Sequence, residues 1–168
     1  DNLSLMTAVM GIDAAWTATA PSSVALVEQS GARWRCVALS PSYSDFNNPA
    51  RRQVDEWNVT HAGEDPRPDH LLMAAQGMIG GSSIDIVAVN MPMSLRLITG
   101  RRRANNEVSR VYAGRGCGTH SPTPSRLGAV SEATRDGFAQ YSLATMTTQP
   151  GTTPAFLEVY PHPALLTL

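Results

Sequence analysis

The spacing of apolar and polar positions changes along the chain, from a period of two near the start to the longer period of helices further on. The first forty residues contain three short runs typical of strands, and the third run alternates like an antiparallel strand with one face in water. We therefore predict a three-stranded antiparallel meander, with strands at 6–13, 23–28 and 33–39 and a tight turn at 29–32.

Beyond the meander, the pattern predicts helices that alternate with apolar strands. The segment 41–49 is rich in Ser, Asn and Pro, which is typical of a loop. Asp69 is placed to cap a helix. We expect helices at 50–57, 70–79, 102–112 and 131–143, strands at 84–89 and 155–160, and a further helix beginning at Pro161. This order of elements predicts an α/β fold with a mixed sheet.

Length and composition indicate an ordinary globular protein. A chain of 168 residues, 42% hydrophobic and 16% charged, is expected to form one domain with its own core. No apolar stretch approaches the roughly 20 residues of a membrane span, so we expect no membrane association. Cys36 and Cys117 match no metal-ligand spacing and predict two reduced thiols in a cytoplasmic protein. An apolar helix that stops at Leu168 predicts that the domain continues beyond this sequence.

Basic residues are unevenly distributed. All 13 are Arg, and the absence of Lys excludes a phosphate-loop lysine and Schiff-base chemistry. The segment from Arg96 to Arg126 holds seven of them and a single acid, Glu107. Such a cluster is either a solvated face or a surface for phosphate groups, and its lack of compensating acids favours phosphate.

Three apolar runs end on a polar side chain suited to metal binding: Asp13, Asn90 and Glu158. Strand ends that deliver carboxylates to one place are typical of sites that hold Mg²⁺ or Mn²⁺. The alternatives are structural: Asp13 could start a turn, Asn90 could end a strand, and Glu158 could face the N-terminus of the helix after it. Asp85 enters its strand rather than leaving it, which indicates a structural role.

The predicted helix at 102–112 adds further candidates. Arg103 and Arg110 are two turns apart and share a face with Asn106, so they could hold successive phosphates. Arg101 and Arg115 belong to the same basic segment and complete the predicted phosphate-binding set, although adjacent arginines cannot all face one way. His120 and His162 are candidate proton shuttles or surface residues, and Trp16 could stack on a base or pack in the core.

Five motifs together resemble an uncharacterised prokaryotic family of predicted nucleases with a ribonuclease H-like fold. They are Gly11-Ile12-Asp13, Val89-Asn90-Met91-Pro92, the Arg103/Asn106/Arg110 helix, Thr119-His120-Ser121-Pro122-Thr123-Pro124 and Glu158-Val159-Tyr160-Pro161. The resemblance implies an antiparallel meander joined to helix-linked parallel strands with flanking helices. It also implies that Asp13 and Glu158 bind metal, with Asn90 and Asn106 where the family has Asp.

The resemblance implies a metal-dependent nuclease that hydrolyses phosphodiester bonds of DNA or RNA, with Asp13, Asn90, Asn106 and Glu158 as its catalytic set. Because an amide supplies no charge to hold Mg²⁺, the two Asn residues leave open an inactive form. One alternative is a catalytically dead module of the same fold that binds nucleic acid or phosphate. A fragment of a sugar-kinase or actin-type phosphotransferase is the other, since Gly11-Ile12-Asp13 is similar to its first strand.

Overall fold

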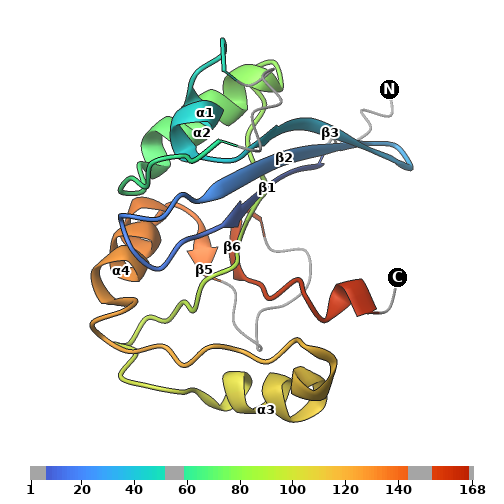
Figure 1. The fold of residues 1–168 in the computed structure, drawn as a ribbon. Coiled ribbons are helices and arrows are strands. Elements are labelled where there is room, and N and C mark those ends of the chain that lie inside the picture. The colour runs from blue at the N-terminus through green and yellow to red at the C-terminus, as the bar shows by residue number, and fades with distance from the viewer. Residues whose placement is uncertain (1–6, 52–58, 144–152, 167–168) are drawn as a thin grey trace.

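Alternating side chains create the first half of the sheet in the computed structural model, which describes residues 7–51, 59–143 and 153–166. Strands β1 (Thr7–Asp13), β2 (Ser23–Ser30) and β3 (Arg33–Ser40) form an antiparallel meander (Figure 1). Alternate residues of β1 and β2 are buried, and Gly31 adopts a positive φ of 61° in the turn between β2 and β3. The predicted meander is confirmed.

Parallel strands extend the sheet on the other side of β1. Strand β4 (Ile86–Val89) pairs with β1, β6 (Ala155–Glu158) pairs with β4, and the two-residue β5 (Ser142–Leu143) pairs with β6. The resulting order is β3-β2-β1-β4-β6-β5. The predicted α/β class with a mixed sheet is therefore confirmed, and the central position of β4 explains why its sequence is almost entirely apolar.

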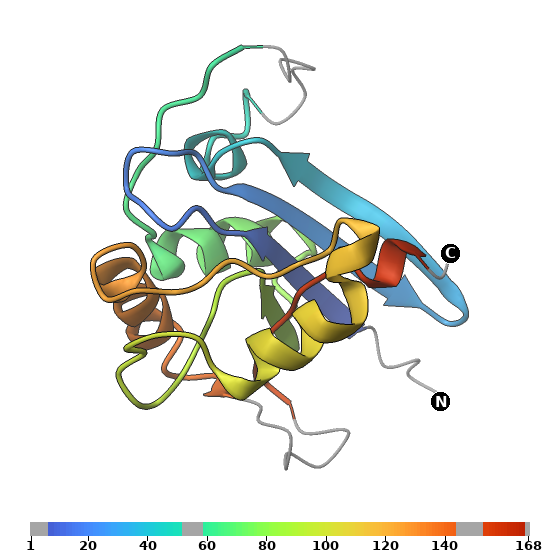
Figure 2. The ribbon, with the colours of Figure 1, turned by 60° about the horizontal axis from the view of Figure 1, so that its bottom comes forward.

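Helices α1 (Tyr43–Asn47), α2 (Pro68–Met78) and α4 (Gly128–Gly137) contribute to the core with the sheet. Their side chains meet those of β1, β2, β4 and β6; the largest fully buried side chains of this core are Phe46, Phe138, Phe156, Met10, Leu26 and Leu71. Figures 1 and 2 show α3 (Arg103–Tyr112) apart from these helices. The 3₁₀ turn η1 (Ala113–Arg115) continues α3, and η2 (Ala164–Leu166) lies near the end of the chain.

The helix predicted at 70–79 is present as α2, but a loop prediction and a helix-cap prediction near the middle of the chain were wrong. Helix α1 falls in a segment predicted as loop, because the Ser42 hydroxyl accepts a hydrogen bond from the Asp45 backbone N–H at 3.1 Å and caps the helix. Helix α2 begins at Pro68 with Arg67 as its N-cap, so Asp69 lies inside the first turn and is not the cap. The helix expected at 50–57 lies mostly outside the described residues.

Boundaries also differ in the second half. Helix α4 ends at Gly137 instead of 143, because Ser142 and Leu143 pair with β6 as a short strand. At the close approach of α4 to α2, a Cβ on Gly137 would lie 2.3 Å from Pro68 Cγ. The final strand is shorter than predicted, and the helix expected from Pro161 is the 3₁₀ turn η2. None of the helices in the described ranges is long and apolar enough to cross a membrane.

Candidate functional site

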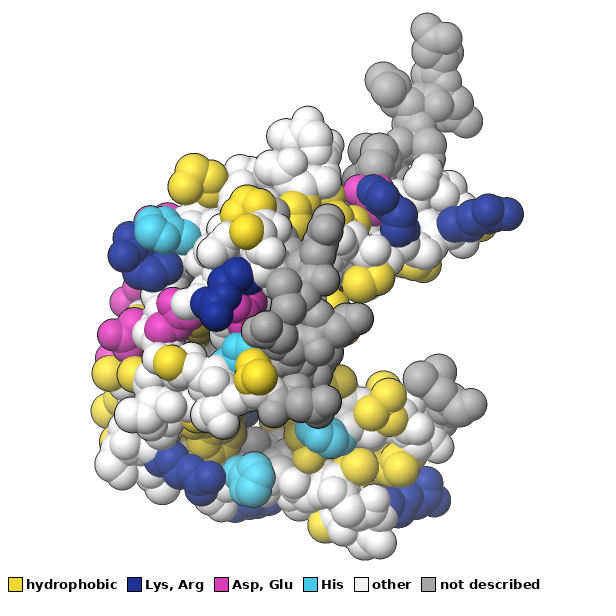
Figure 3. All heavy atoms as spheres, turned by 45° about the horizontal axis from the view of Figure 1, so that its top comes forward, with side chains coloured by type: hydrophobic (Ala, Val, Ile, Leu, Met, Phe, Trp, Pro, Cys, Tyr) yellow, Lys and Arg dark blue, Asp and Glu magenta, His cyan; other side chains and the backbone are white. Residues whose placement is uncertain are grey.

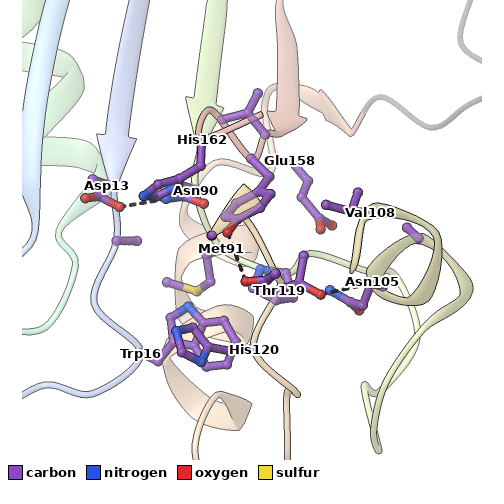
Figure 4. Close-up of a pocket in the computed structure, with 17 residues that line it drawn as sticks. Asp13, Trp16, Asn90, Met91, Asn105, Val108, Thr119, His120, Glu158 and His162 are labelled. Atoms are coloured by element: carbon purple, nitrogen blue, oxygen red, sulfur yellow. Dashed lines mark hydrogen bonds between the residues drawn. The ribbon is translucent and has the colours of Figure 1, made fainter. Parts of the chain in front are cut away.

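The ends of β1, β4 and β6 bring the three predicted strand-end residues to one edge of the sheet. Ile12 pairs with Val89, and Val89 pairs with Glu158, so Asp13, Asn90 and Glu158 occupy neighbouring positions in register. All three line a pocket of about 470 Å³ (Figure 4). Their expected convergence is confirmed, and it follows from the parallel pairing of the strands that carry them.

The rest of the pocket comes from α3, from the loop after β1, from the chain after η1 and from the segments that follow β4 and β6. Helix α3 contributes Asn105 and Val108, the loop after β1 contributes Trp16, and the chain after η1 contributes Thr119 and His120. The remaining lining residues are Ala14, Met91, Pro92, Ala104, Gly116, Gly118, Val159, Tyr160 and His162. Both predicted accessory histidines, His120 and His162, therefore face this pocket.

Asp13 and Asn90 form a hydrogen-bonded pair. The Asn90 Nδ2 donates to Asp13 Oδ1 at 2.9 Å, and the Asn90 backbone N–H donates to the Ile12 carbonyl at 2.8 Å. Because a carboxylate only accepts, the Asn90 amide turns its NH₂ to Asp13 and its oxygen away. Asp13 is exposed, and within the described ranges no donor reaches its second oxygen, Oδ2.

Glu158 is held very differently. Arg102 Nη1 donates to Glu158 Oε2 at 2.6 Å, and Arg102 Nη2 donates to Oε1. The Met93 backbone N–H donates to Oε2 at 2.9 Å. Arg102 is itself oriented by the Asn105 Oδ1, 3.0 Å from its Nε, and by the Met93 carbonyl, 3.1 Å from Nη1. The carboxylate predicted to bind metal is thus engaged through both oxygens by a bidentate ion pair.

The residues present do not fit a divalent metal ion. Within the described part of the chain, no group of three or more His, Cys, Asp or Glu side chains could hold one. Asn90 turns a donor toward Asp13, and Arg102 already neutralises Glu158. A hard cation needs several oxygen ligands with negative charge, and this arrangement offers one exposed carboxylate.

Asn106, the fourth predicted ligand, is absent from the pocket lining. Its Oδ1 accepts from Arg101 Nε at 2.8 Å on the exposed side of α3. Its neighbour Asn105 is buried and lines the pocket instead. Adjacent positions on a helix point about 100° apart. Asn105 therefore faces the pocket, whereas Asn106 faces the surface.

The predicted phosphate-binding arginines fall into different environments. Arg101 is engaged by protein acceptors, including the Thr119 carbonyl at 2.9 Å and the Ser109 hydroxyl at 2.7 Å. Arg110 is exposed and forms an ion pair with Glu107 at 2.9 Å. Arg103 and Arg115 are exposed and have no acidic partner in the described ranges. Of the four predicted arginines, only Arg103 and Arg115 are left without such partners in the described residues and so stay available to a phosphate.

Aromatic side chains form two pairs in the pocket wall. Trp16 and His120 meet edge to face at 6.1 Å, and Tyr160 and His162 lie 5.0 Å apart with their rings tilted by 35°. The guanidinium of Arg126 lies 5.5 Å from the Trp16 ring centre. Trp16 also packs against the core, which confirms one of the two alternatives predicted for it, and its stacking on a base stays a prediction.

The Tyr160 hydroxyl fixes the chain after η1 to the end of β6. It donates to the Gly118 carbonyl at 3.1 Å. Burial raises the pKa of Tyr160, and the nearby Cys117 raises it further. The phenol therefore stays protonated, and stays a donor, at neutral pH.

Arg102 is the site residue that sequence reasoning missed as such. It lies 56 positions from Glu158, so no spacing in the sequence links the two. The sequence held one signal for it: Arg101, Arg102 and Arg103 are adjacent, so they cannot all point the same way.

No family model, curated protein or solved structure matches the chain. The chemistry of the pocket therefore rests on its own residues: two aromatic pairs, the Asp13–Asn90 pair and the Arg102–Glu158 pair.

Proposed function

We propose that this chain is a metal-independent nucleic-acid-binding domain of ribonuclease H-like type. The observation that carries the proposal is the ion pair between Arg102 and Glu158, which takes both oxygens of the carboxylate that a metal centre would need. In this site Arg102 neutralises Glu158, and Asn90 stands where the resembled family has Asp. Such a site is suited to binding rather than to metal-assisted hydrolysis, which needs several charged carboxylates.

The sheet supports the fold part of the proposal. An antiparallel meander, β1 to β3, is followed by the parallel strands β4 and β6 on the other side of β1. This is the arrangement that the resemblance to the predicted nucleases implied, and three of its strands end at the pocket.

The arginines support the nucleic-acid part. Arg103 and Arg115 directly adjoin the pocket-lining residues Ala104 and Gly116, and both lack an acidic partner in the described ranges. Unpaired arginines bind phosphates and release counterions, which gives an affinity that falls steeply with salt and depends little on sequence.

The test is fluorescence anisotropy with a labelled single-stranded oligonucleotide in EDTA. We expect binding that weakens steadily with salt, is unchanged by Mg²⁺ or Mn²⁺, and leaves the oligonucleotide intact. Arg103→Gln/Arg115→Gln should weaken binding and reduce the salt slope by about two, since each phosphate contact contributes about one.

The matched control removes two arginines outside the basic segment, Arg33→Gln/Arg67→Gln. It makes the same change in net charge but leaves the pocket surroundings intact. Equal weakening by the control, or an absence of binding at low salt, would overturn the proposal.

A metal-dependent nuclease is the second candidate, because Asp13, Asn90 and Glu158 line one pocket. That function requires Glu158 to leave Arg102 when metal enters. Cleavage of the same oligonucleotide in Mg²⁺ or Mn²⁺, abolished by Asp13→Asn, would establish this candidate over the first.

A further inference from the structure

We propose that the pocket receives one unpaired nucleobase that carries an exocyclic amine, while the phosphates on either side stay outside on the arginines. This inference rests on the proposed function and states which part of the nucleic acid enters the site.

The size and walls of the pocket suit a base. At about 470 Å³ it falls within the range of small-molecule sites. Its aromatic members lie on two sides: Figure 4 shows His162 beside the Asp13–Asn90 pair, and Trp16 with His120 beyond Met91. Aromatic side chains are the platforms on which unpaired bases stack in single-strand binding proteins.

The charges inside the pocket disfavour a phosphate there. Asp13 carries a carboxylate with no cationic partner among the described residues, and the charge of Arg102 is already neutralised by Glu158. Arg103 and Arg115, which pair with no acid in the part of the chain that the structure describes, are exposed and adjoin lining residues without lining the pocket themselves. The pocket therefore suits a neutral group, and its surroundings suit anionic groups. A nucleotide has both: its base is neutral, and its backbone phosphates are anionic.

The polar groups at the strand ends select the kind of base. Asp13 Oδ2 and Asn90 Oδ1 are acceptors that no donor reaches within the described part of the chain. Adenine, cytosine and guanine each present an NH₂ group that could donate to such a pair, whereas thymine and uracil present a single ring N–H. The geometry therefore favours a base with an amine.

The experiment separates base from backbone. Eight-residue DNA strands made entirely of abasic sites are compared with the same strands carrying a single dC, dA or dT at the centre. All have the same phosphates, so arginine contacts contribute equally. We expect dC and dA to strengthen binding about tenfold over the abasic strand, as one stacked and hydrogen-bonded base would, and dT to strengthen it less.

Two substitutions connect the effect to the pocket. Asp13→Asn places a donor where the amine would donate and should reduce the gain from dC and dA to that from dT. His162→Ala should lower the gain from every base, whereas His70→Ala, an exposed His on α2 outside the pocket, should leave it unchanged. Far-ultraviolet circular dichroism establishes that each variant is folded.

The possible failures are distinguishable. If the abasic strand binds as tightly as the strands with a base, the inference is overturned and the proposed function stands. If no strand binds even at low salt, the proposed function fails. A gain from dC and dA that survives Asp13→Asn would place the base elsewhere and also overturn the inference.

Discussion

Asp13 and Glu158 end β1 and β6, which run parallel on either side of β4 in the mixed sheet, and both line one pocket, yet their surroundings are opposite. Asp13 is exposed, and within the described ranges its carboxylate accepts a single hydrogen bond, from the neutral amide of Asn90. Glu158 accepts hydrogen bonds from Nη1 and Nη2 of Arg102 and from the Met93 backbone N–H. An acid at the end of an apolar strand is therefore not by itself a metal ligand, because its partners decide which role it has.

The difference has a local cause. The loop between β4 and α3 brings the Met93 backbone N–H to Glu158, and the first turn of α3 presents Asn105 to orient Arg102. In the described ranges, neither a guanidinium nor a backbone N–H donates to the Asp13 carboxylate, which lies where the chain leaves β1 for the pocket wall. The side of the pocket that carries Glu158 is consequently held by the protein's own contacts, and the side that carries Asp13 is open to a ligand.

The largest effect should come from removing Arg102. Arg102→Gln leaves Glu158 without its cation and loses the contacts to Asn105 and Met93, so we expect the free energy of unfolding to fall by about 2 kcal/mol. The side chains of Arg102 and Glu158 are only 23% and 31% exposed, which limits solvent screening of the pair. Urea denaturation measures the change.

Arg110 provides the matched control. It pairs with Glu107, but these side chains are 71% and 55% exposed, and Arg110→Gln should cost less than about 0.5 kcal/mol. Equal costs for the two arginines would contradict the structural role assigned to Arg102.

A second prediction concerns metal binding. Asn90→Asp/Arg102→Gln creates two neighbouring carboxylates and frees Glu158, so we expect it to bind Mn²⁺ at least about tenfold more tightly than Asn90→Asp/Asn106→Asp, a difference of about 1.4 kcal/mol. In the latter variant Glu158 remains paired with Arg102, and position 106 lies outside the pocket lining. Calorimetric titration of both folded variants gives the comparison.

If Asn90→Asp/Asn106→Asp bound Mn²⁺ more tightly than Asn90→Asp/Arg102→Gln, position 106 would reach the metal site and Arg102 would not block it. The chain without substitutions should bind Mn²⁺ no better than Asn90→Asp/Asn106→Asp, because it has fewer carboxylates at the same positions.

The sequence predicted the meander and the convergence of Asp13, Asn90 and Glu158, because a period of two and parallel strand ends are local signals with a fixed geometric result. It missed α1, whose capping by Ser42 was hidden in a segment of loop-forming residues. It also extended α4 over Ser142 and Leu143, since their pairing with β6 is a tertiary contact.

The candidate site was less predictable than the fold. The Arg102–Glu158 pair joins residues 56 positions apart, and nothing in the composition of the basic segment distinguishes Arg102 from Arg101 or Arg103. Asn105 rather than Asn106 faces the pocket because α3 begins at Arg103 and presents that face. Which of two adjacent helix residues faces a pocket depends on how the helix packs, and the sequence pattern does not contain that information.

The smallest changes in the free energy of unfolding are expected from two acids at strand ends, Asp85 at the start of a strand and Asp13 at the end of one. Asp85, just before β4, accepts from the Ala8 backbone N–H at 2.8 Å, so Asp85→Ala should lower the free energy of unfolding by about 1 kcal/mol. Asp13→Ala removes an exposed side chain held by one amide and should change it by less than about 0.5 kcal/mol. Thermal denaturation of both variants under identical conditions measures the two changes. A larger loss for Asp13→Ala would mean that Asp13 is held by the protein's own contacts, which would remove the reason to treat its side of the pocket as the one open to a ligand.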